Sequence, residues 1–132
     1  MHLYFGKEVY WYKDSSYAIV DILIPSCKEL CDLVPLLQEI KNNSSNFRLI
    51  VASNPGKSAA YNRNRCLEAS EAPFVIMMDD DISGLYPGWD LELITSLQLD
   101  AAISIVSARL LQPDGYTPGP MMSSKKDLSG DF

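Results

Sequence analysis

The sequence predicts an α/β domain with a mainly parallel sheet flanked by helices. Short apolar runs that suit buried strands alternate with segments of helical periodicity. Polar residues, prolines or glycines follow most of these runs and end them. Alternation of strand and helix is the pattern that produces parallel sheets with right-handed crossovers.

The composition is that of one globular domain. The chain has 132 residues, which is enough for one domain and too few for two. Its 47% hydrophobic and 21% charged residues are ordinary values. The formal net charge of -6 argues against general binding to nucleic acid or to an anionic membrane, because the overall field repels phosphate. An anionic ligand would need local cations or a bound metal ion.

The three cysteines, Cys27, Cys31 and Cys66, fit neither a disulfide framework nor a zinc cluster. We expect them to be reduced residues of the core, and reduced thiols predict a cytoplasmic location. No apolar run approaches the roughly 18–20 residues of a membrane span, and the N-terminus lacks a signal-peptide pattern. The sequence therefore predicts no transmembrane segment.

Three parts of the chain differ in composition. Residues 1–20 are rich in aromatic side chains, and Gly6-Lys7 suits the turn of a hairpin or flap at the sheet edge. The predicted α/β domain covers residues 21–119. The last part is rich in Pro, Gly, Ser and Lys, and we expect residues 120–132 to form a flexible tail.

Four apolar segments of the α/β domain are predicted to be strands. They are residues 21–25, 47–52, 74–78 and 101–111. The periodicity of residues 30–42 predicts an amphipathic helix. Pro35 fits only near a first turn, so we expect this helix to begin at about Asp32. Two further helices are predicted over residues 58–69 and from Pro87-Gly88-Trp89 to about Leu99.

Polar clusters follow three of these strands, at Pro25-Ser26, at Ser53-Asn54 and at Asp79-Asp80-Asp81. Ligands of such sheets bind beyond the carboxyl ends of the strands, so we expect the three clusters to share one crevice. Consecutive carboxylates repel one another unless a cation neutralises them. Asp79 and Asp81 can point the same way and hold Mg²⁺ or Mn²⁺. The alternative is an acidic, solvated turn or a helix cap.

The segment 54–65 forms a second candidate binding region. A glycine turn leads into a predicted helix N-terminus, which is a natural site for an anion. Lys57, Arg63 and Arg65 add positive charge within an acidic chain. The alternative is a surface helix with solvated basic residues.

Part of this segment also imitates a P-loop. Gly56-Lys57-Ser58 follows one predicted strand, and Met78-Asp79 ends another in the manner of a Walker B strand. The imitation fails at Val51, where a P-loop needs a glycine. A P-loop-like nucleotidase is therefore the third of three functional hypotheses.

From about Asp21 to Gly119 the sequence resembles the family-two glycosyltransferases, truncated before their usual acceptor-binding region. Five similar pieces occur in the order that this family shows. They are residues 21–29 (IIPTYNE in the family), 54–64 (NxGxxxAxNxG), 74–81 (the strand leading into Asp-x-Asp), 87–89 (PGW) and 107–115 (GPRLLxPDG).

The resemblance implies a GT-A-like, Rossmann-related fold and a metal-dependent glycosyltransferase. Such an enzyme moves a sugar from a UDP-, GDP- or dTDP-sugar donor to an acceptor hydroxyl, here unknown, with Mn²⁺ or Mg²⁺ as cofactor. Asp79 and Asp81 would hold the metal and the diphosphate, and Asp80 would lie near the ribose or the donor sugar. The remaining donor-binding residues implied are Pro25, Ser26, Ser53, Asn54, Lys57, Asn62 and Arg63.

The sequence departs from the family pattern in two places. Ala52-Ser53 stands where the family usually has an acidic residue that contacts the base, so the identity of the base is open. A catalytic base usually lies further along, and Asp127 and Asp131 are the late candidates here. The second hypothesis is therefore a catalytically incomplete module that binds nucleotide and metal.

Overall fold

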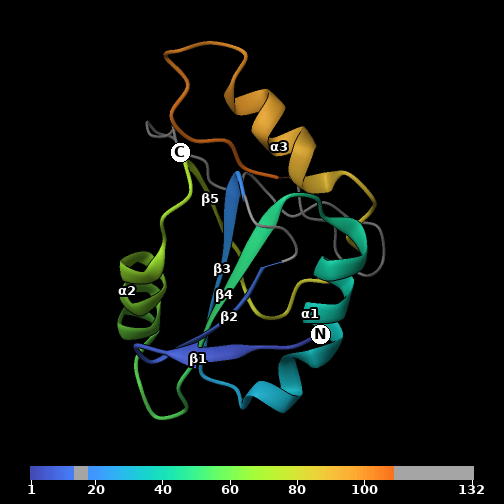
Figure 1. Cartoon of the computed structure of the whole chain (residues 1–132). Helices are drawn as coiled ribbons and strands as arrows, with labels where there is room; N and C mark the ends of the chain where they lie inside the picture. Colours follow the sequence, from blue (N-terminus) through green and yellow to red (C-terminus); the bar gives the residue numbers. More distant parts are fainter. Residues whose placement is uncertain (14–17, 109–132) are drawn as a thin grey trace, which may run out of the picture. The chain divides into compact units, whose positions relative to one another are not determined.

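The computed structural model describes residues 1–13 and 18–108. The described residues form five strands and three helices (Figure 1). In chain order they are β1 (Tyr4–Gly6), β2 (Val9–Lys13), β3 (Val20–Ser26), α1 (Leu30–Asn43), β4 (Phe47–Ser53), α2 (Ala59–Ala69), β5 (Phe74–Met77) and α3 (Trp89–Leu97). The chain divides into two compact units, Met1–Leu91 and Glu92–Phe132, and the whole sheet belongs to the first.

The strands form one mixed sheet in the order β1-β2-β4-β3-β5. β3 is parallel to both β4 and β5, whereas β2 is antiparallel to β1 and to β4. The α/β class is thus confirmed, and the expected parallel sheet is found in part, since the sheet is mixed. The parallel part is limited to three strands, because an N-terminal hairpin, rather than another βα unit, pairs with the free edge of β4.

The hairpin turns one residue later than Gly6-Lys7 predicts. Gly6 still pairs with Val9, so the loop consists of Lys7 and Glu8 alone. Both loop residues have positive φ, 55° and 66°, which is the backbone of a type I′ turn. This turn type matches the twist of paired strands, and that match offsets the strain of two non-glycine residues in the left-handed region.

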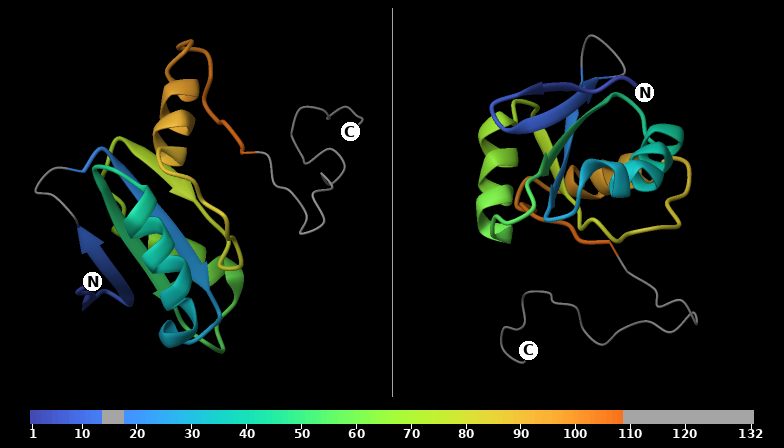
Figure 2. Two further views of the ribbon diagram at one scale, coloured as in Figure 1. Left: turned by 90° about the vertical axis from the view of Figure 1, so that its right-hand side faces the viewer. Right: turned by 90° about the horizontal axis from the view of Figure 1, so that it is seen from below.

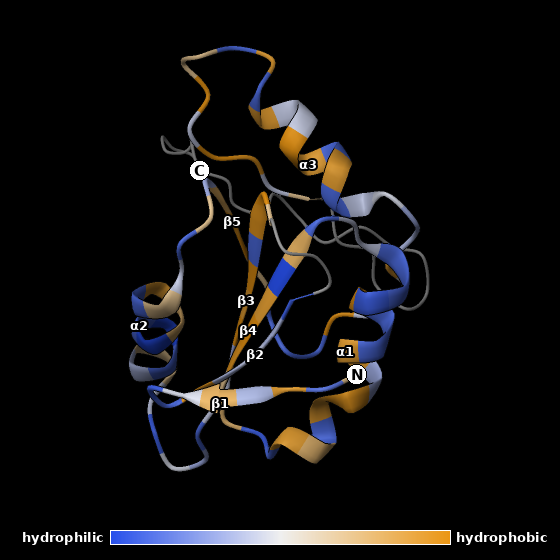
Figure 3. Ribbon diagram, viewed as in Figure 1, coloured by the Kyte–Doolittle hydropathy of each residue, from blue (hydrophilic) through white to orange (hydrophobic). Residues whose placement is uncertain are grey.

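Both faces of β3 and β4 are buried, whereas Val75 and Met77 on one face of β5 are exposed. Figures 1 and 2 show α1 and α2 on opposite sides of the sheet. On one side, Leu23, Ile50 and Ala52 pack with Val9 and with Cys66 of α2. The strand residues that point to the other side are equally buried, namely Ile22, Ile24, Leu49 and Val51. Four side chains of α1 are also buried, namely Leu33, Leu36, Leu37 and Ile40. Figure 3 accordingly shows β3 and β4 as largely hydrophobic.

One predicted boundary and one predicted strand are corrected. α1 begins at Leu30, not at about Asp32, so Pro35 lies in the second turn with its ring exposed. The helix tolerates the lost backbone hydrogen bond because its opposite side is buried. Residues 101–108 do not form the predicted strand, and residues 109–111 lie outside the described residues. Ile103 and Ile105 are exposed there, and none of the five described strands pairs with this run, so its apolar composition alone does not make it a strand.

The amino ends of β3 and β4 are joined by a buried ion pair. The guanidinium of Arg48 donates to both oxygens of Asp21, at 3.0 and 3.2 Å. Asp21 is fully buried and also accepts from the Ser70 hydroxyl and from the backbone N–H groups of Glu71 and Ala72. Burial favours a raised pKa for Asp21, but these donors together lower the pKa below its ordinary value.

Among the described residues, no helix is long and apolar enough to cross a membrane.

Candidate functional site

The carboxyl ends of three parallel strands bring the predicted polar clusters to one edge of the sheet. Ser26 at the end of β3 is in register with Ser53 at the end of β4. Beyond β5, the N–H of Met78 donates to the carbonyl of Leu23 at 2.9 Å, so the pairing continues to the residue before the acidic triplet. The triplet therefore leaves the sheet beside the end of β3.

The central carboxylate of the triplet is held by β3 and by the loop that follows it. The Ser26 hydroxyl donates to Oδ2 of Asp80 at 2.7 Å. The Lys28 ammonium lies 3.7 Å from Oδ1 of Asp80, and the Lys28 N–H donates to the Ser26 hydroxyl oxygen at 2.9 Å. These contacts fix the direction in which Asp80 points.

Asn62 of α2 links the ends of β3 and β4 to the helix. Its side chain is fully buried, its Nδ2 donates to the Ser26 carbonyl at 3.0 Å, and its Oδ1 accepts from Nδ2 of Asn54 at 2.9 Å. The N–H of Asn54 also donates to the Ser26 carbonyl, at 3.2 Å. Ser53 joins the same edge, since its hydroxyl donates to the Lys28 carbonyl at 2.7 Å. The polar floor of the site is thus rigid.

The loop between β4 and α2 is a tight turn. The N–H of Lys57 donates to the Asn54 carbonyl at 3.1 Å, and Gly56 has φ of 89°, so Pro55 and Gly56 occupy the positions that a type II turn prefers for them. Ser58 caps α2 by accepting from the Tyr61 N–H at 3.0 Å. The Lys57 amide and the Ser58 hydroxyl are therefore both used within the loop and the helix cap.

The predicted basic residues lie just before α2 and on it, with Lys57 and Arg63 exposed and Arg65 partly buried. The Lys57 ammonium lies 5.0 Å from the centroid of the Tyr61 ring, and the Arg65 guanidinium lies at the same distance. A hydrogen bond to Glu8 raises the pKa of Tyr61. Arg63 is exposed and makes no hydrogen bond or ion pair with any described residue.

The outer two carboxylates of the triplet differ from Asp80. Asp79 and Asp81 are exposed, and within residues 1–13 and 18–108 neither side chain has a hydrogen-bond or ion-pair partner. The same residues contain no group of three or more His, Cys, Asp or Glu side chains arranged to hold a metal ion. Two hard oxygen donors still fit Mg²⁺ or Mn²⁺, because these ions usually keep several waters and phosphate oxygens in their coordination shell.

The structure brings together five of the residues that the sequence singled out, namely Ser26, Ser53, Asn54, Asn62 and Asp80. Pro25 is half-buried within β3. Lys57, Arg63, Asp79 and Asp81 occupy exposed positions. Asp127 and Asp131 lie outside the described residues. The sequence analysis did not single out Lys28, which contacts Asp80. A basic residue two positions after the end of a strand, in an acidic chain, is a signal that could have identified it.

The prediction that all three cysteines belong to the core is wrong for two of them. Cys27 and Cys31 are exposed, because one lies in the loop after β3 and the other on the outer side of α1. The Cys27 thiol donates to the Lys57 carbonyl at 3.2 Å and so joins the two loops of the site. Cys66 is buried, and burial raises its pKa to about 11, which keeps it a protonated core residue.

Comparison with protein-family models, with curated proteins and with solved structures finds no match to this chain.

Proposed function

We propose that the carboxyl edge of the parallel strands binds a nucleotide-diphosphate sugar together with Mn²⁺ or Mg²⁺, and that the protein is a metal-dependent glycosyltransferase of the GT-A type. The observation that carries the proposal is the contrast within the acidic triplet. Asp80 is fixed by Ser26 and Lys28, while Asp79 and Asp81 on either side of it are exposed and have no partner within residues 1–13 and 18–108.

A divalent cation is the ligand that this arrangement favours most. Three adjacent carboxylates repel one another, and the single ammonium of Lys28, at 3.7 Å from Asp80, offsets only part of their charge. Asp79 and Asp81 would hold the metal with water and diphosphate oxygens. When bound, the metal would offset the charge that develops on a departing diphosphate.

The residues around the triplet suit the rest of such a donor. Asn54 is partly exposed and is held in place by the buried amide of Asn62, so it offers a rigid polar group to a base or a ribose. Ser26 is buried, and its hydroxyl orients Asp80. Lys57 is exposed just before the N-cap of α2, and Arg63 is exposed in the second turn of the helix; both are proposed to reach diphosphate oxygens. Asp80 is proposed to position the donor sugar or ribose, since its own carboxylate is already oriented.

The P-loop alternative receives less support from the same loop. A P-loop offers free backbone N–H groups to phosphates and a Ser or Thr hydroxyl to Mg²⁺. Here the Lys57 N–H closes a turn onto Asn54, and the Ser58 hydroxyl caps α2.

Isothermal titration with Mn²⁺ and UDP, GDP or dTDP tests the binding. We expect one of the three diphosphates to bind only when Mn²⁺ is present, and the double variant D79N/D81N to lose at least about tenfold in affinity. The matched control E68Q/E71Q removes the same two charges from positions outside the site and should bind like the unmodified protein. Equal binding by D79N/D81N would refute the proposed site.

A second assay separates an enzyme from a binding module. The matching sugar donor is incubated with Mn²⁺, and release of free nucleoside diphosphate is measured with and without candidate acceptors. Turnover that D79N/D81N abolishes supports a transferase. Binding without any turnover would support the catalytically incomplete module instead.

A further inference from the structure

A pocket of about 280 Å³ lies between the hairpin, β4 and the C-terminal part of α2. Its walls share no residue with the strand-end site. The lining residues that matter here are Lys7, Val9, Trp11, Ile50 and Ala69. Its size is close to the lower end of small-molecule sites, roughly 300–1,000 Å³, so it can hold a compact one- or two-ring molecule.

The floor and one wall of this pocket are apolar. Val9 and Ile50 belong to the buried core cluster, and Trp11 and Ala69 pack against it as partly buried neighbours. Tyr4 stacks on the Trp11 ring with 4.7 Å between ring centroids, which holds the indole in place. A ligand that covers this floor gains from burying an aromatic or aliphatic surface against it.

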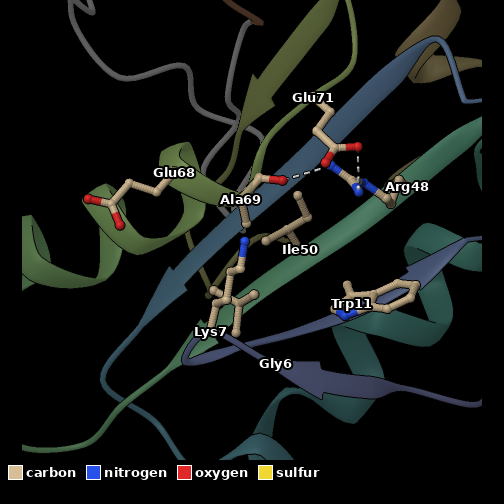
Figure 4. A pocket seen from close by; sticks show the side chains of 9 residues that line it. Gly6, Lys7, Trp11, Arg48, Ile50, Glu68, Ala69 and Glu71 are labelled. Atoms are coloured by element: carbon tan, nitrogen blue, oxygen red, sulfur yellow. Dashed lines mark hydrogen bonds and ion pairs between the residues drawn. The ribbon is translucent and has the colours of Figure 1, made fainter.

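Lys7 is one of the pocket's four charged residues, and it is exposed. Figure 4 shows its side chain extending from the hairpin toward Ala69 and Ile50, while the Glu68 carboxylate turns away. Lys7 has no hydrogen bond or ion pair with any described residue.

The other three charged residues of the pocket are already paired. Glu68 pairs with Arg65 at 2.7 Å. Arg48 is occupied by Asp21 and the Ala69 carbonyl, and Glu71 lies 3.5 Å from its guanidinium. The net result is an unpaired ammonium over an apolar floor beside an aromatic ring.

We propose that this pocket binds a small aromatic carboxylate, with the ring on the apolar floor beside Trp11 and the carboxylate on the Lys7 ammonium. An anion is required because Lys7 is the unpaired charge, and a flat ring is required because the floor is a sheet surface extended by an indole. A neutral ring would lose the charge-assisted hydrogen bond, and an aliphatic anion would lose most of the ring contact.

The test is a titration of the full chain with indole-3-carboxylate, followed by amide NMR, with indole-3-carboxamide as the neutral probe. We expect shifts confined to the hairpin, Ile50 and the end of α2. The amide should bind at least about fivefold more weakly, as should the acid to Lys7→Met or Lys7→Gln. Lys41→Met on α1 removes the same charge elsewhere and should bind the acid normally.

The proposal is overturned by equal affinity for acid and amide, by unchanged binding to both Lys7 variants, by shifts that map elsewhere, or by no shift at millimolar acid. None of these outcomes bears on the strand-end site, because the two sites share no residue.

Discussion

The two ends of the parallel strands use the same kinds of residue in opposite ways. At the amino end, Asp21 is fully buried and receives five hydrogen bonds from Arg48, Ser70, Glu71 and Ala72. At the carboxyl end, Asp79 and Asp81 are exposed and have no partner among the described residues. A carboxylate with all its partners inside the chain stabilises the fold, whereas one without them is available to a ligand.

The largest effect is expected from removing the Arg48 cation at the amino end, which tests whether the paired carboxylate there stabilises the fold. Arg48→Met leaves the Asp21 carboxylate buried without its charged partner, and we expect a loss of about 3–5 kcal/mol in the free energy of unfolding. Urea denaturation followed by circular dichroism measures this. The double variant D21N/R48M should recover part of the loss, and a single variant within about 0.5 kcal/mol of the unmodified protein would contradict a structural role for the pair.

Low pH should lower the free energy of unfolding through Asp21, at the same end of the sheet. The folded pKa of Asp21 is below the unfolded value of 3.8, so its contribution to stability is complete above that pH and is lost as the pH falls through the folded pKa. Unfolding free energies measured from about pH 5 downwards should therefore fall more steeply for the unmodified protein than for Asp21→Asn. Parallel curves for the two proteins would show that Asp21 is not the titrating group.

The buried amide at the carboxyl end should matter for both stability and the site. Asn62→Ala removes the hydrogen bonds to Ser26 and Asn54, with an expected cost of about 1–3 kcal/mol. Asn64→Ala, on the exposed side of the same helix, should change the free energy of unfolding by less than about 0.5 kcal/mol. Equal effects of the two substitutions would mean that Asn62 does not brace the strand ends.

The smallest effect on the free energy of unfolding is expected for the exposed carboxylates of Asp79 and Asp81. D79N/D81N should leave the free energy of unfolding unchanged within about 0.5 kcal/mol, or raise it slightly at low salt, because repulsion within the triplet decreases. Thermal denaturation at two salt concentrations measures this. A clear loss of stability would indicate that these carboxylates have partners within the fold.

The strand-and-helix alternation predicted most of the elements because β3, β4 and β5 contain apolar runs and α1 has one apolar side. The hairpin's attachment to β4 was not predictable, since edge pairing depends on which strand is left free and not on local pattern. The strand predicted from Ala101 onwards was wrong for the same reason. Its composition suits a strand, but a strand forms only where another strand is free to pair with it.

The site was predictable in outline and not in detail. Parallel strands bring their carboxyl ends together, so the meeting of Ser26, Asn54 and Asp80 followed from the topology. Which member of the acidic triplet would be held could not be derived, because alternation along a strand no longer applies once the chain leaves β5 at Met77. The role of Lys28 depended on the same loop geometry.

Paramagnetic broadening of amide NMR signals by substoichiometric Mn²⁺ tests the central claim most directly, because it compares the two ends of the sheet in one experiment. Our account predicts broadening around Asp79, Asp81 and Ser26, strengthened by a nucleoside diphosphate, with the signals of Asp21 and Arg48 unaffected. Broadening centred on the amino end, or none at the acidic triplet, would contradict it.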